Sequence, residues 1–314
     1  MKHLIPFSGI ALFAACSTPV SAPNEVTPLT AYPSYAGSYD GFTLVIDDRF
    51  DQLDTTLWRP GDGAVGGESI CRFQDQGVVV ENGHLKLIVR PEAVAPSYSK
   101  DHQQEKGPYD YVCGELRTVD DRRFHYGRFE ARMKAPNRAT ASGYISSLFT
   151  YRFDTDPSSD TPESTEWEEI DVELEGGRPD KFQANLIYGK DTWEWWRTRV
   201  YGAWEDKIEV GPVDEWRVFA IEWLPDSIRW YVDGELVKTL TADDIDCQPD
   251  CIAPQEKPTP IPNNPTTIFM NFWIPNDDIQ DYFGGNKERN QYPMTTEYDW
   301  FRYYRWDGAP EDAS

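Results

Sequence analysis

The sequence has few of the residues that most common enzyme sites require. Only four histidines are present, His3, His84, His102 and His125, and no two of them have the spacing of paired metal ligands. A histidine-based metal site or a Ser-His-Asp triad is therefore not expected. The sequence also contains no phosphate-binding glycine loop and no helix-rich stretch of the kind found in α/β nucleotide-binding proteins.

Basic residues are scarce as well. The chain holds 54 acidic and 30 basic residues, which gives a formal net charge of −24 at pH 7. Nucleic acids and anionic membranes bind basic surfaces, so neither is an expected partner. Aromatic residues, by contrast, are abundant, with 12 Trp, 17 Tyr and 15 Phe. That number exceeds what one core needs, and exposed aromatic faces suit the flat apolar faces of sugar rings.

The first 40 residues are typical of an export signal and a tether. A short basic start precedes the apolar run Leu4 to Ala15, which is too short to span a bilayer and has the length of a signal-peptide core. Phe13-Ala14-Ala15-Cys16 resembles a bacterial lipobox, which predicts a signal peptide over 1–16 and a lipidated Cys16. The alternative is ordinary signal cleavage near Ala14 or Ala15. Residues 17–40 are rich in Ser, Thr, Pro and Ala and predict a flexible linker.

These features predict an exported protein. We expect an outer-membrane or cell-surface lipoprotein, attached to the membrane only through its lipid anchor. A freely secreted protein is the alternative.

From Phe42 onward the pattern is that of many short strands separated by Gly, Pro, Asn and Asp. Their regular spacing indicates an all-β fold, a two-sheet sandwich or barrel, and not βαβ units. Asp233-Gly234 between two apolar runs predicts a type I′ hairpin turn. We expect one domain over 41–308 and a tail over 309–314, with loops around 96–112, 153–165 and 246–266. The expected strands are Phe42–Asp47, Gly77–Val80, Leu85–Arg90, Gly114–Thr118, Gly127–Lys134, Gly143–Tyr151, Trp167–Glu175, Phe182–Ile187, Trp216–Trp223, Ile228–Val232, Glu235–Leu240, Thr267–Trp273 and Glu297–Arg305.

One of these strands, Trp167–Glu175, alternates acidic and aliphatic residues from Glu169 onward. A period of two predicts a buried face with Ile170, Val172 and Leu174, and an opposite face with Glu169, Asp171 and Glu173 in a row. Neighbouring carboxylates repel one another, and this repulsion, with partial burial, raises the pKa of at least one of them. One ionised and one protonated carboxyl group are what glycoside hydrolysis uses. The structural alternative is an exposed edge strand whose charges block aggregation.

Five cysteines are present. Cys16 belongs to the leader, so an exported chain keeps Cys71, Cys113, Cys247 and Cys251, which suggests two disulfides. Three connectivities are open. Cys71–Cys113 with Cys247–Cys251 is favoured, the second bridge closing a tight loop over Gln248-Pro249-Asp250.

The acidic strand resembles the E-x-D-x-E catalytic strand of glycoside hydrolase family 16, and further segments resemble that family in order. The similarity looks close to the bacterial lichenases, the endo-β-1,3-1,4-glucanases, and runs from about Asp48 to Tyr304. Cys71 and Cys113 fall where the lichenase disulfide cysteines fall. The resemblance implies a β-jelly-roll sandwich of two antiparallel sheets with a concave substrate cleft. The segments that carry it are Gly114–Thr118, Tyr126–Lys134, Ser146–Tyr151, Trp230–Gly234, Met270–Trp273 and Glu297–Trp300.

The resemblance also implies roles for the acidic row: Glu169 as nucleophile, Glu173 as acid/base and Asp171 as the helper between them. Residues four apart on a strand have Cα atoms about 13 Å apart. A retaining glycosidase holds its two carboxyl groups only about 5–5.5 Å apart. The two glutamates must therefore lean inward on a concave, twisted strand. A second assignment moves the pair to Glu168 or Glu175, but Glu168 falls on the opposite face from Glu169.

Further positions follow from the same resemblance. The implied substrate-binding residues are Trp167, Glu115, Arg117, Phe149, Tyr151, Asn185 and Trp273, with core packing as the alternative for any single aromatic residue. Asp299 matches the side-chain ligand of the family's structural calcium, whose other ligands are backbone carbonyls that map near Arg49 and Gly83. No cofactor is expected for catalysis. Ile187 departs from the Tyr that lichenases carry, which leaves the exact glucan open.

The sequence therefore favours a monomeric, retaining endo-β-glucanase. It would hydrolyse β-1,3-1,4-glucan or a related β-glucan polysaccharide through a covalent glycosyl-enzyme intermediate. One alternative is a transglycosylase of β-glucan or xyloglucan type on the same scaffold. The other is a non-catalytic carbohydrate-binding jelly roll, although a pure binder has no use for a repulsive carboxylate row.

Overall fold

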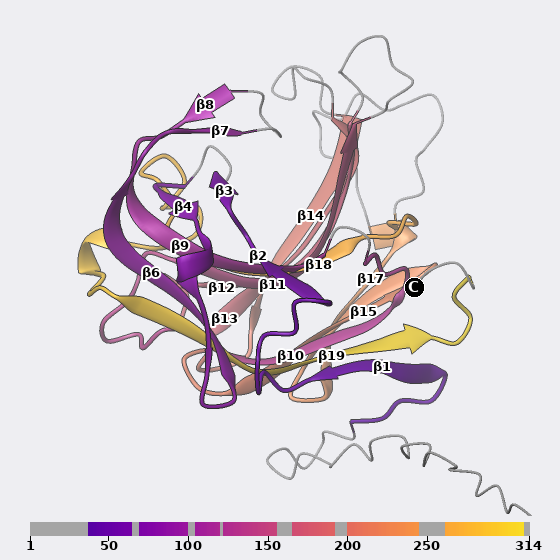
Figure 1. Ribbon diagram of the computed structural model, residues 1–314. Helices are drawn as coiled ribbons and strands as arrows, with labels where there is room; N and C mark the ends of the chain where they lie inside the picture. Colours follow the sequence, from indigo (N-terminus) through magenta and orange to yellow (C-terminus); the bar gives the residue numbers. More distant parts are fainter. Residues whose placement is uncertain are drawn as a thin grey trace, which may run out of the picture.

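Strands account for almost all of the regular structure in the computed structural model, and they stack in two curved layers (Figure 1). The structure describes residues 37–64, 69–99, 104–119, 122–155, 165–191, 200–244 and 261–310. The acidic strand lies in the middle of one layer, which we call the inner sheet. No helix among the described residues is long and apolar enough to cross a membrane.

The inner sheet is antiparallel, and its flanks β9 and β14 rise on either side of a floor that includes β11, β12 and β18 (Figure 1). Its strand order is β2 (Trp58–Pro60), β9 (Tyr109–Thr118), β18 (Thr267–Trp273), β11 (Ile145–Thr155), β12 (Thr165–Glu175), β13 (Lys181–Asp191) and β14 (Val200–Glu209).

The outer sheet is also antiparallel. Its order is β17 (Glu235–Thr241), β16 (Ser227–Val232), β15 (Arg217–Leu224), β10 (Gly127–Lys134) and β19 (Met294–Trp306). On the side away from β10, strand β19 pairs with two strands, β1 (Phe42–Asp48) along its C-terminal part and β6 (His84–Val94) along its N-terminal part. Strand β5 (Val78–Glu81) pairs with β6.

The two sheets are continuous with each other, because β6 leaves the outer sheet and pairs with β9 of the inner sheet. One pair departs from the expected antiparallel arrangement: β4 (Cys71–Phe73), which also pairs with β3 (Gly63–Ala64), runs parallel to β9. The expected loop over 96–112 is wrong, because β7 (Ser97–Ser99) and β8 (Gln104–Lys106) form a hairpin there and β9 begins at Tyr109. The only helices in the described ranges are short 3-10 helices, η1 (Asp75–Gly77), η2 (Ala242–Asp244) and η3 (Lys287–Arg289).

The core fills the space between the sheets. Ile170, Val172 and Leu174 of β12 are at most 1 % exposed, so the predicted buried face of this strand is confirmed. Phe182 of β13 packs edge-on against Phe219 of β15, with ring centroids 5.6 Å apart. Burial of large apolar side chains on this scale is the main favourable term in folding.

All thirteen predicted strands are present, with ends that move by a few residues. The hairpin at Asp233-Gly234 is confirmed, since both residues have positive φ, 52° and 86°, as a type I′ turn requires. Strand β14 was missed, as were the short strands β2, β3 and β4 and the β7–β8 hairpin. Strand β11 also runs four residues further than predicted, from Tyr151 to Thr155.

The chain joins the outer sheet earlier than the predicted linker boundary at residue 40. The Tyr304 hydroxyl donates to the Gly37 carbonyl at 2.7 Å, and the Tyr39 hydroxyl hydrogen-bonds the Glu130 carboxylate. The Arg128 guanidinium is sandwiched 4.0 Å from the ring centroids of both Tyr39 and Tyr231. Gly37 and Tyr39 are therefore held against the outer sheet, where Tyr39 covers a buried charged pair.

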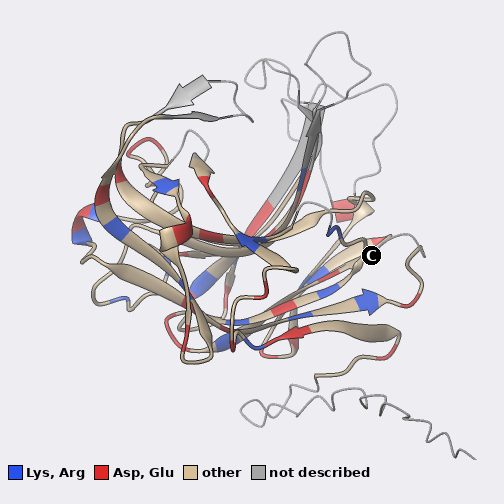
Figure 2. Cartoon of the chain, viewed as in Figure 1, with Lys and Arg blue, Asp and Glu red and all other residues tan. Residues whose placement is uncertain are grey.

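Basic positions (blue) are scattered among acidic ones (red) over the strands seen in Figure 2. Many of them are paired in space: Arg128 contacts both Glu130 and Glu222, and Arg138 contacts both Asp180 and Asp214. The cationic charge in these pairs is thus largely neutralised locally.

Candidate active site

Strand register places the acidic row on the face of the inner sheet that points away from the core. Asp171 of β12 lies between Phe149 of β11 and Asn185 of β13. Glu173 lies between Ser147 and Gln183 in the next row. Because side chains alternate along a strand, all these residues share the concave face.

Glu169 forms the third row, between Tyr151 of β11 and Ile187 of β13. Its side chain is partly exposed on the concave face. The apolar neighbour Ile187 stands where a Tyr was expected from the resemblance.

Asp171 is the most buried of the three carboxyl groups, with 2 % of the residue exposed. Burial, and then the charges of Glu169 and Glu173, raise the pKa of Asp171 well above its usual value, against a smaller opposing effect of a hydrogen bond from Asn185. Its Oδ2 atom makes no hydrogen bond in the described part of the chain. On the core side, the Trp230 indole of the outer sheet donates to the Asp171 carbonyl at 2.9 Å. Asp171 is therefore a rigidly placed carboxyl that favours its protonated form.

Glu173 accepts a hydrogen bond from the Gln183 side-chain amide, Nε2 to Oε2, at 3.0 Å. Burial and the charges of Glu169 and Glu175 raise the pKa of Glu173 to about 8, against an opposing effect of Lys207. A carboxyl with this pKa carries its proton at neutral pH, which suits a general acid. The charge of each of Glu169, Asp171 and Glu173 affects the protonation of its neighbours, so the three carboxyl groups titrate as one coupled system.

The second assignment, to Glu168 or Glu175, does not fit the geometry. Glu168 points to the opposite face, where it accepts hydrogen bonds from Asn264 Nδ2 at 2.8 Å and from the Asn264 backbone N–H at 3.0 Å. Glu175 shares the concave face but is 1 % exposed and forms an ion pair with Arg178. Both carboxylates therefore hold neighbouring segments in place.

The expected substrate-binding residues on β9, β11 and β13 share the face of the acidic row. Register links Arg117 to Phe269, Phe269 to Phe149, and Phe149 to Asp171 in one line across the sheet. Glu115, Asn271 and Ser147 form the corresponding line that ends at Glu173. The structure therefore brings Glu115, Arg117, Phe149, Tyr151 and Asn185 together beside the carboxylates.

Phe269, at the centre of this surface, was missed. Its ring stacks on Phe149 with centroids 5.0 Å apart, meets Tyr151 edge-on at 5.5 Å, and lies 5.5 Å from the Arg117 guanidinium carbon. A signal for it was present, since Phe269, Asn271 and Trp273 alternate along a predicted strand and must share a face.

Trp273 lies at one end of the surface, in contact with a second aromatic group that was also missed. Phe283 packs edge-on against Trp273 at 5.8 Å and against Tyr282 at 4.9 Å, and Tyr282 is 46 % exposed. Trp167 belongs to β12 opposite Gly189, but its side chain lies outside the described residues.

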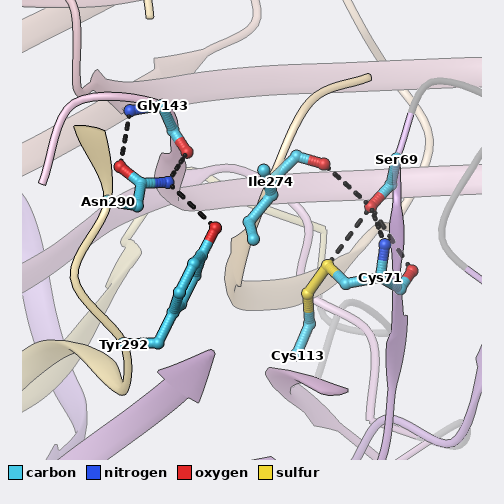
Figure 3. Close-up of a disulfide and its surroundings, with 7 residues drawn as sticks. All are labelled: Ser69, Cys71, Cys113, Gly143, Ile274, Asn290 and Tyr292. Atoms are coloured by element: carbon cyan, nitrogen blue, oxygen red, sulfur yellow. Dashed lines mark hydrogen bonds between the residues drawn. A yellow bond between two sulfur atoms is a disulfide. The ribbon is translucent and has the colours of Figure 1, made fainter. Parts of the chain in front are cut away.

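The expected disulfide joins Cys71 to Cys113, with Cα atoms 5.8 Å apart (Figure 3). Ser69 Oγ lies 3.2 Å from Cys71 Sγ, donates to the Ile274 carbonyl at 3.1 Å and accepts from the Cys71 N–H at 3.1 Å. The bridge thus attaches β4 to β9, the strand that carries Glu115 and Arg117. Cys16, Cys247 and Cys251 lie outside the described residues.

Asp299, the expected calcium ligand, faces Arg132 and His84. Arg132 Nη1 lies 2.5 Å from its Oδ2, and His84 Nε2 lies 3.5 Å from its Oδ1. Within the described ranges, no cluster of three or more His, Cys, Asp or Glu side chains could hold a metal ion. Calcium prefers several oxygen ligands, and the expected site supplies one carboxylate, which pairs with Arg132 here, and backbone carbonyls near Arg49 and Gly83. The calcium site stays a prediction.

Comparison with known proteins identifies the family that the chain matches. The model of the family described as glycosyl hydrolases family 16 matches residues 68–301. A beta-glucanase of Bacillus amyloliquefaciens is 31 % identical over 260 residues, which cover 82 % of this chain and 85 % of that protein. A beta-glucanase of Brevibacillus brevis is 33 % identical over 258 residues, 82 % of this chain and 80 % of its relative.

Solved structures show the same fold. A prokaryotic β-1,3-1,4-glucanase (lichenase) derived from a mouse hindgut metagenome superposes with a TM-score of 0.58 at 25 % identity, covering 83 % of this chain and 99 % of that one. The catalytic domain of an endo-1,3-β-glucanase (laminarinase) from Thermotoga petrophila superposes with a TM-score of 0.63 at 22 % identity, covering 85 % and 99 %.

Proposed function

The chain belongs to glycoside hydrolase family 16, and from that premise we propose that it is a retaining endo-β-glucanase. The observation that supports this most directly is the carboxylate row on β12. Its members share one face, Asp171 is buried between the other two, and Glu173 has a pKa of about 8.

In the first step, Glu173 donates its proton to the glycosidic oxygen while the Glu169 carboxylate attacks the anomeric carbon. The glycosidic bond breaks, the leaving chain departs with the proton, and a covalent glycosyl–Glu169 ester forms. In the second step, Glu173, now a carboxylate, removes a proton from water. The water oxygen attacks the anomeric carbon and releases Glu169, so the product keeps the original configuration.

Asp171 supports both steps as a neighbour of the nucleophile. A protonated carboxyl at this position donates a hydrogen bond to Glu169 and shares its proton as the charge of Glu169 changes. Its burial keeps the proton available near neutral pH.

The substrate that we propose is a β-1,3-1,4-glucan. Two relatives are named beta-glucanase, and a lichenase at 25 % identity has the same fold. The laminarinase similarity, at 22 % identity, supports only the fold. Aromatic rings and the polar side chains of Glu115, Arg117 and Asn271 line the concave face, an arrangement that suits stacking and hydrogen bonding to successive sugar units.

Two substitutions test the roles. We expect Glu169→Gln and Glu173→Gln each to lower turnover of barley β-glucan by orders of magnitude without unfolding the protein. Glu209→Gln is the control, because this side chain is 71 % exposed and lies outside the row. Azide should restore cleavage of an activated substrate by Glu173→Ala, because a good leaving group departs without an acid and azide then attacks the anomeric carbon without a base, which releases Glu169 and forms a glycosyl azide. Activity near that of the wild type in either Gln variant would refute the assignment.

Product analysis tests the substrate and the acceptor. Barley β-glucan, laminarin and xyloglucan are digested with and without acceptor oligosaccharides. The proposal is supported if barley β-glucan is the substrate that is cut and its products are hydrolysis products. If the main products are chains extended by the acceptor, the protein is a transglycosylase.

We also propose that the mature protein is anchored through a lipidated Cys16. The proposal rests on the apolar leader and the lipobox-like Phe13-Ala14-Ala15-Cys16. Expression of wild type and Cys16→Ser in a Gram-negative host, followed by fractionation, tests it. Wild type in the membrane fraction and the variant in the soluble fraction are the expected result; both proteins in the soluble medium would refute it.

A further inference from the structure

A charged cluster on the concave face borders the acidic row and has no part in the two-step reaction. It consists of Glu175, Arg178 and Lys207. Glu175 is almost fully buried and pairs with Arg178, and Lys207 Nζ lies 3.7 Å from Glu175 Oε1. A buried carboxylate with two cationic partners is held firmly, because removing either partner would leave its charge poorly compensated.

Lys207 is placed by contacts on two sides. Besides Glu175, its Nζ lies 4.4 Å from the ring centroid of Tyr282, a distance at which a cation is attracted to the aromatic face. Its side chain is only 23 % exposed. The ammonium group therefore has a defined position and is not a freely moving surface charge.

That position is in the row of Glu173. Register aligns Glu173 with Gln183 and Gln183 with Lys207, so Lys207 stands two strands away on the same face. Two strand spacings are roughly 10 Å. At this distance a unit charge at the edge of a protein still shifts a pKa by about half a unit to one unit.

The other groups around Glu173 are mostly anionic or neutral. Its own strand contributes Glu169, Asp171 and Glu175, and β14 contributes Glu205 beside Lys207. Gln183 of β13, Ser147 of β11 and Asn271 of β18 are uncharged, and Glu115 of β9 ends the row. Arg178 follows β12 and is engaged by Glu175. Lys207 is thus the cation of the Glu173 row in the described part of the inner sheet.

We propose that Lys207 is a positioning residue for the acid/base carboxyl: held between Glu175 and Tyr282, it limits how tightly Glu173 keeps its proton. The proposal rests on the proposed function, because it takes Glu173 as the acid/base. Without a nearby cation, the four neighbouring carboxylates would raise the pKa of Glu173 further and make it a weaker acid. An acid works best with a pKa near the working pH, and Lys207 moves Glu173 in that direction.

The test is the pH profile of kcat/KM, whose alkaline limb reports the deprotonation of the acid in the free enzyme. Lys207→Gln removes a positive charge and should move this limb to higher pH by about half a unit to one unit. Lys207→Arg keeps the charge and should restore the limb. Glu175→Gln removes a negative charge and should move the limb in the opposite direction.

Lys181→Gln is the matched control. Lys181 lies on the same face in the adjacent row and forms a 3.6 Å ion pair with the exposed Glu209. Lys181 is 41 % exposed and its charge is compensated by Glu209 and screened by water, unlike that of the 23 % exposed Lys207, so its loss should leave the limb unmoved. If Lys207→Gln lowers activity or melting temperature with no movement of the limb, Lys207 has only a structural role and the proposal is wrong.

Glu173→Gln distinguishes this failure from failure of the proposed function. If Glu173→Gln is active, the acid/base assignment itself fails. If Glu173→Gln is inactive while the limb of Lys207→Gln stays at the wild-type pH, only the role of Lys207 fails. If Glu175→Gln does not fold, the movement of the limb to higher pH in Lys207→Gln and its restoration in Lys207→Arg still decide the matter.

Discussion

Loss of the Cys71–Cys113 disulfide should destabilise the protein strongly. The bridge spans 42 positions in the sequence, and both cysteines are fully buried. A cross-link of that span removes conformational entropy from the unfolded chain, and the chain-entropy relation gives about 4 kcal/mol of stabilisation. For a domain of this size, that corresponds to a fall in melting temperature of roughly 8–16 °C.

The double variant Cys71→Ala/Cys113→Ala is the appropriate perturbation, because a reductant reaches buried sulfur atoms slowly in the folded state. Differential scanning calorimetry of wild type and variant measures the change. Ser69→Ala is the control: it keeps the bridge but removes the hydrogen bonds to Ile274 and Cys71 shown in Figure 3, which should cost only about 1–2 kcal/mol.

The same variant reports on the concave face. The bridge holds β4 against β9, and the Gly61 N–H donates to the Glu115 carbonyl at 2.8 Å beside it. We therefore expect KM for β-glucan to rise more than kcat falls. A melting temperature within 2 °C of the wild-type value, with both cysteines shown by mass spectrometry to be bridged in wild type, would refute the entropy argument (2 °C being about the shift from 1 kcal/mol).

Three further perturbations follow from the structure. Glu173 has a pKa of about 8 in the folded state, above the pKa of a glutamate in the unfolded chain. Between these two pKa values the folded state keeps a proton that the unfolded state loses, so the free energy of unfolding falls as the pH rises. Glu173→Gln should therefore be more heat-stable than wild type at pH 8, by a few degrees in calorimetry, with the difference disappearing near pH 4. Gly177→Ala should destabilise by several kcal/mol in urea unfolding, because a Cβ there would lie 0.8 Å from the Gly284 carbonyl oxygen. Chelation with EDTA tests the predicted calcium site at Asp299: loss of a bound ion should lower the melting temperature by more than 5 °C, reversed by calcium, whereas an unchanged melting temperature would show that Arg132 neutralises Asp299 without an ion (5 °C being about 2 kcal/mol).

The parts of the fold that depend on local patterns were predictable from the sequence. The alternation in Trp167–Glu175 predicted both faces of β12, because a strand has a fixed period of two. Asp233-Gly234 predicted its hairpin, because few residues adopt positive φ at two successive positions. The candidate catalytic residues came from the same alternation together with the family resemblance.

The parts that depend on strand register were not predictable. Strand β14 begins in a Trp-rich stretch and carries Gly202 and Ala203, which are weak strand formers, so its place is fixed by pairing with β13. The contact between Lys207 and Glu175 joins residues on strands that are not neighbours. Tyr282 reaches Lys207 from a segment about seventy residues further along the chain, and no short-range pattern encodes such a meeting.

The acidic row is costly to the fold, and the surrounding residues show how the cost is offset. A buried Asp171 and a half-buried Glu173 repel their neighbours, which by itself would favour disorder in β12. The strand is held from the core side by Ile170, Val172 and Leu174 and by the hydrogen bond from Trp230 to the Asp171 carbonyl. Because this support comes from the core-facing side of β12, the strand stays ordered although the carboxyl groups on its other face repel one another. The carboxyl groups can therefore stay close together, as catalysis requires. A Trp230→Phe substitution loses the indole N–H and also leaves a cavity, because phenylalanine is smaller than the fully buried tryptophan. It should lower stability by about 1–3 kcal/mol for the buried hydrogen bond, with the cavity adding to this, and it should also lower turnover because Asp171 is misplaced. Turnover equal to wild type, measured alongside calorimetry on the same preparation, would show that the strand needs no such support.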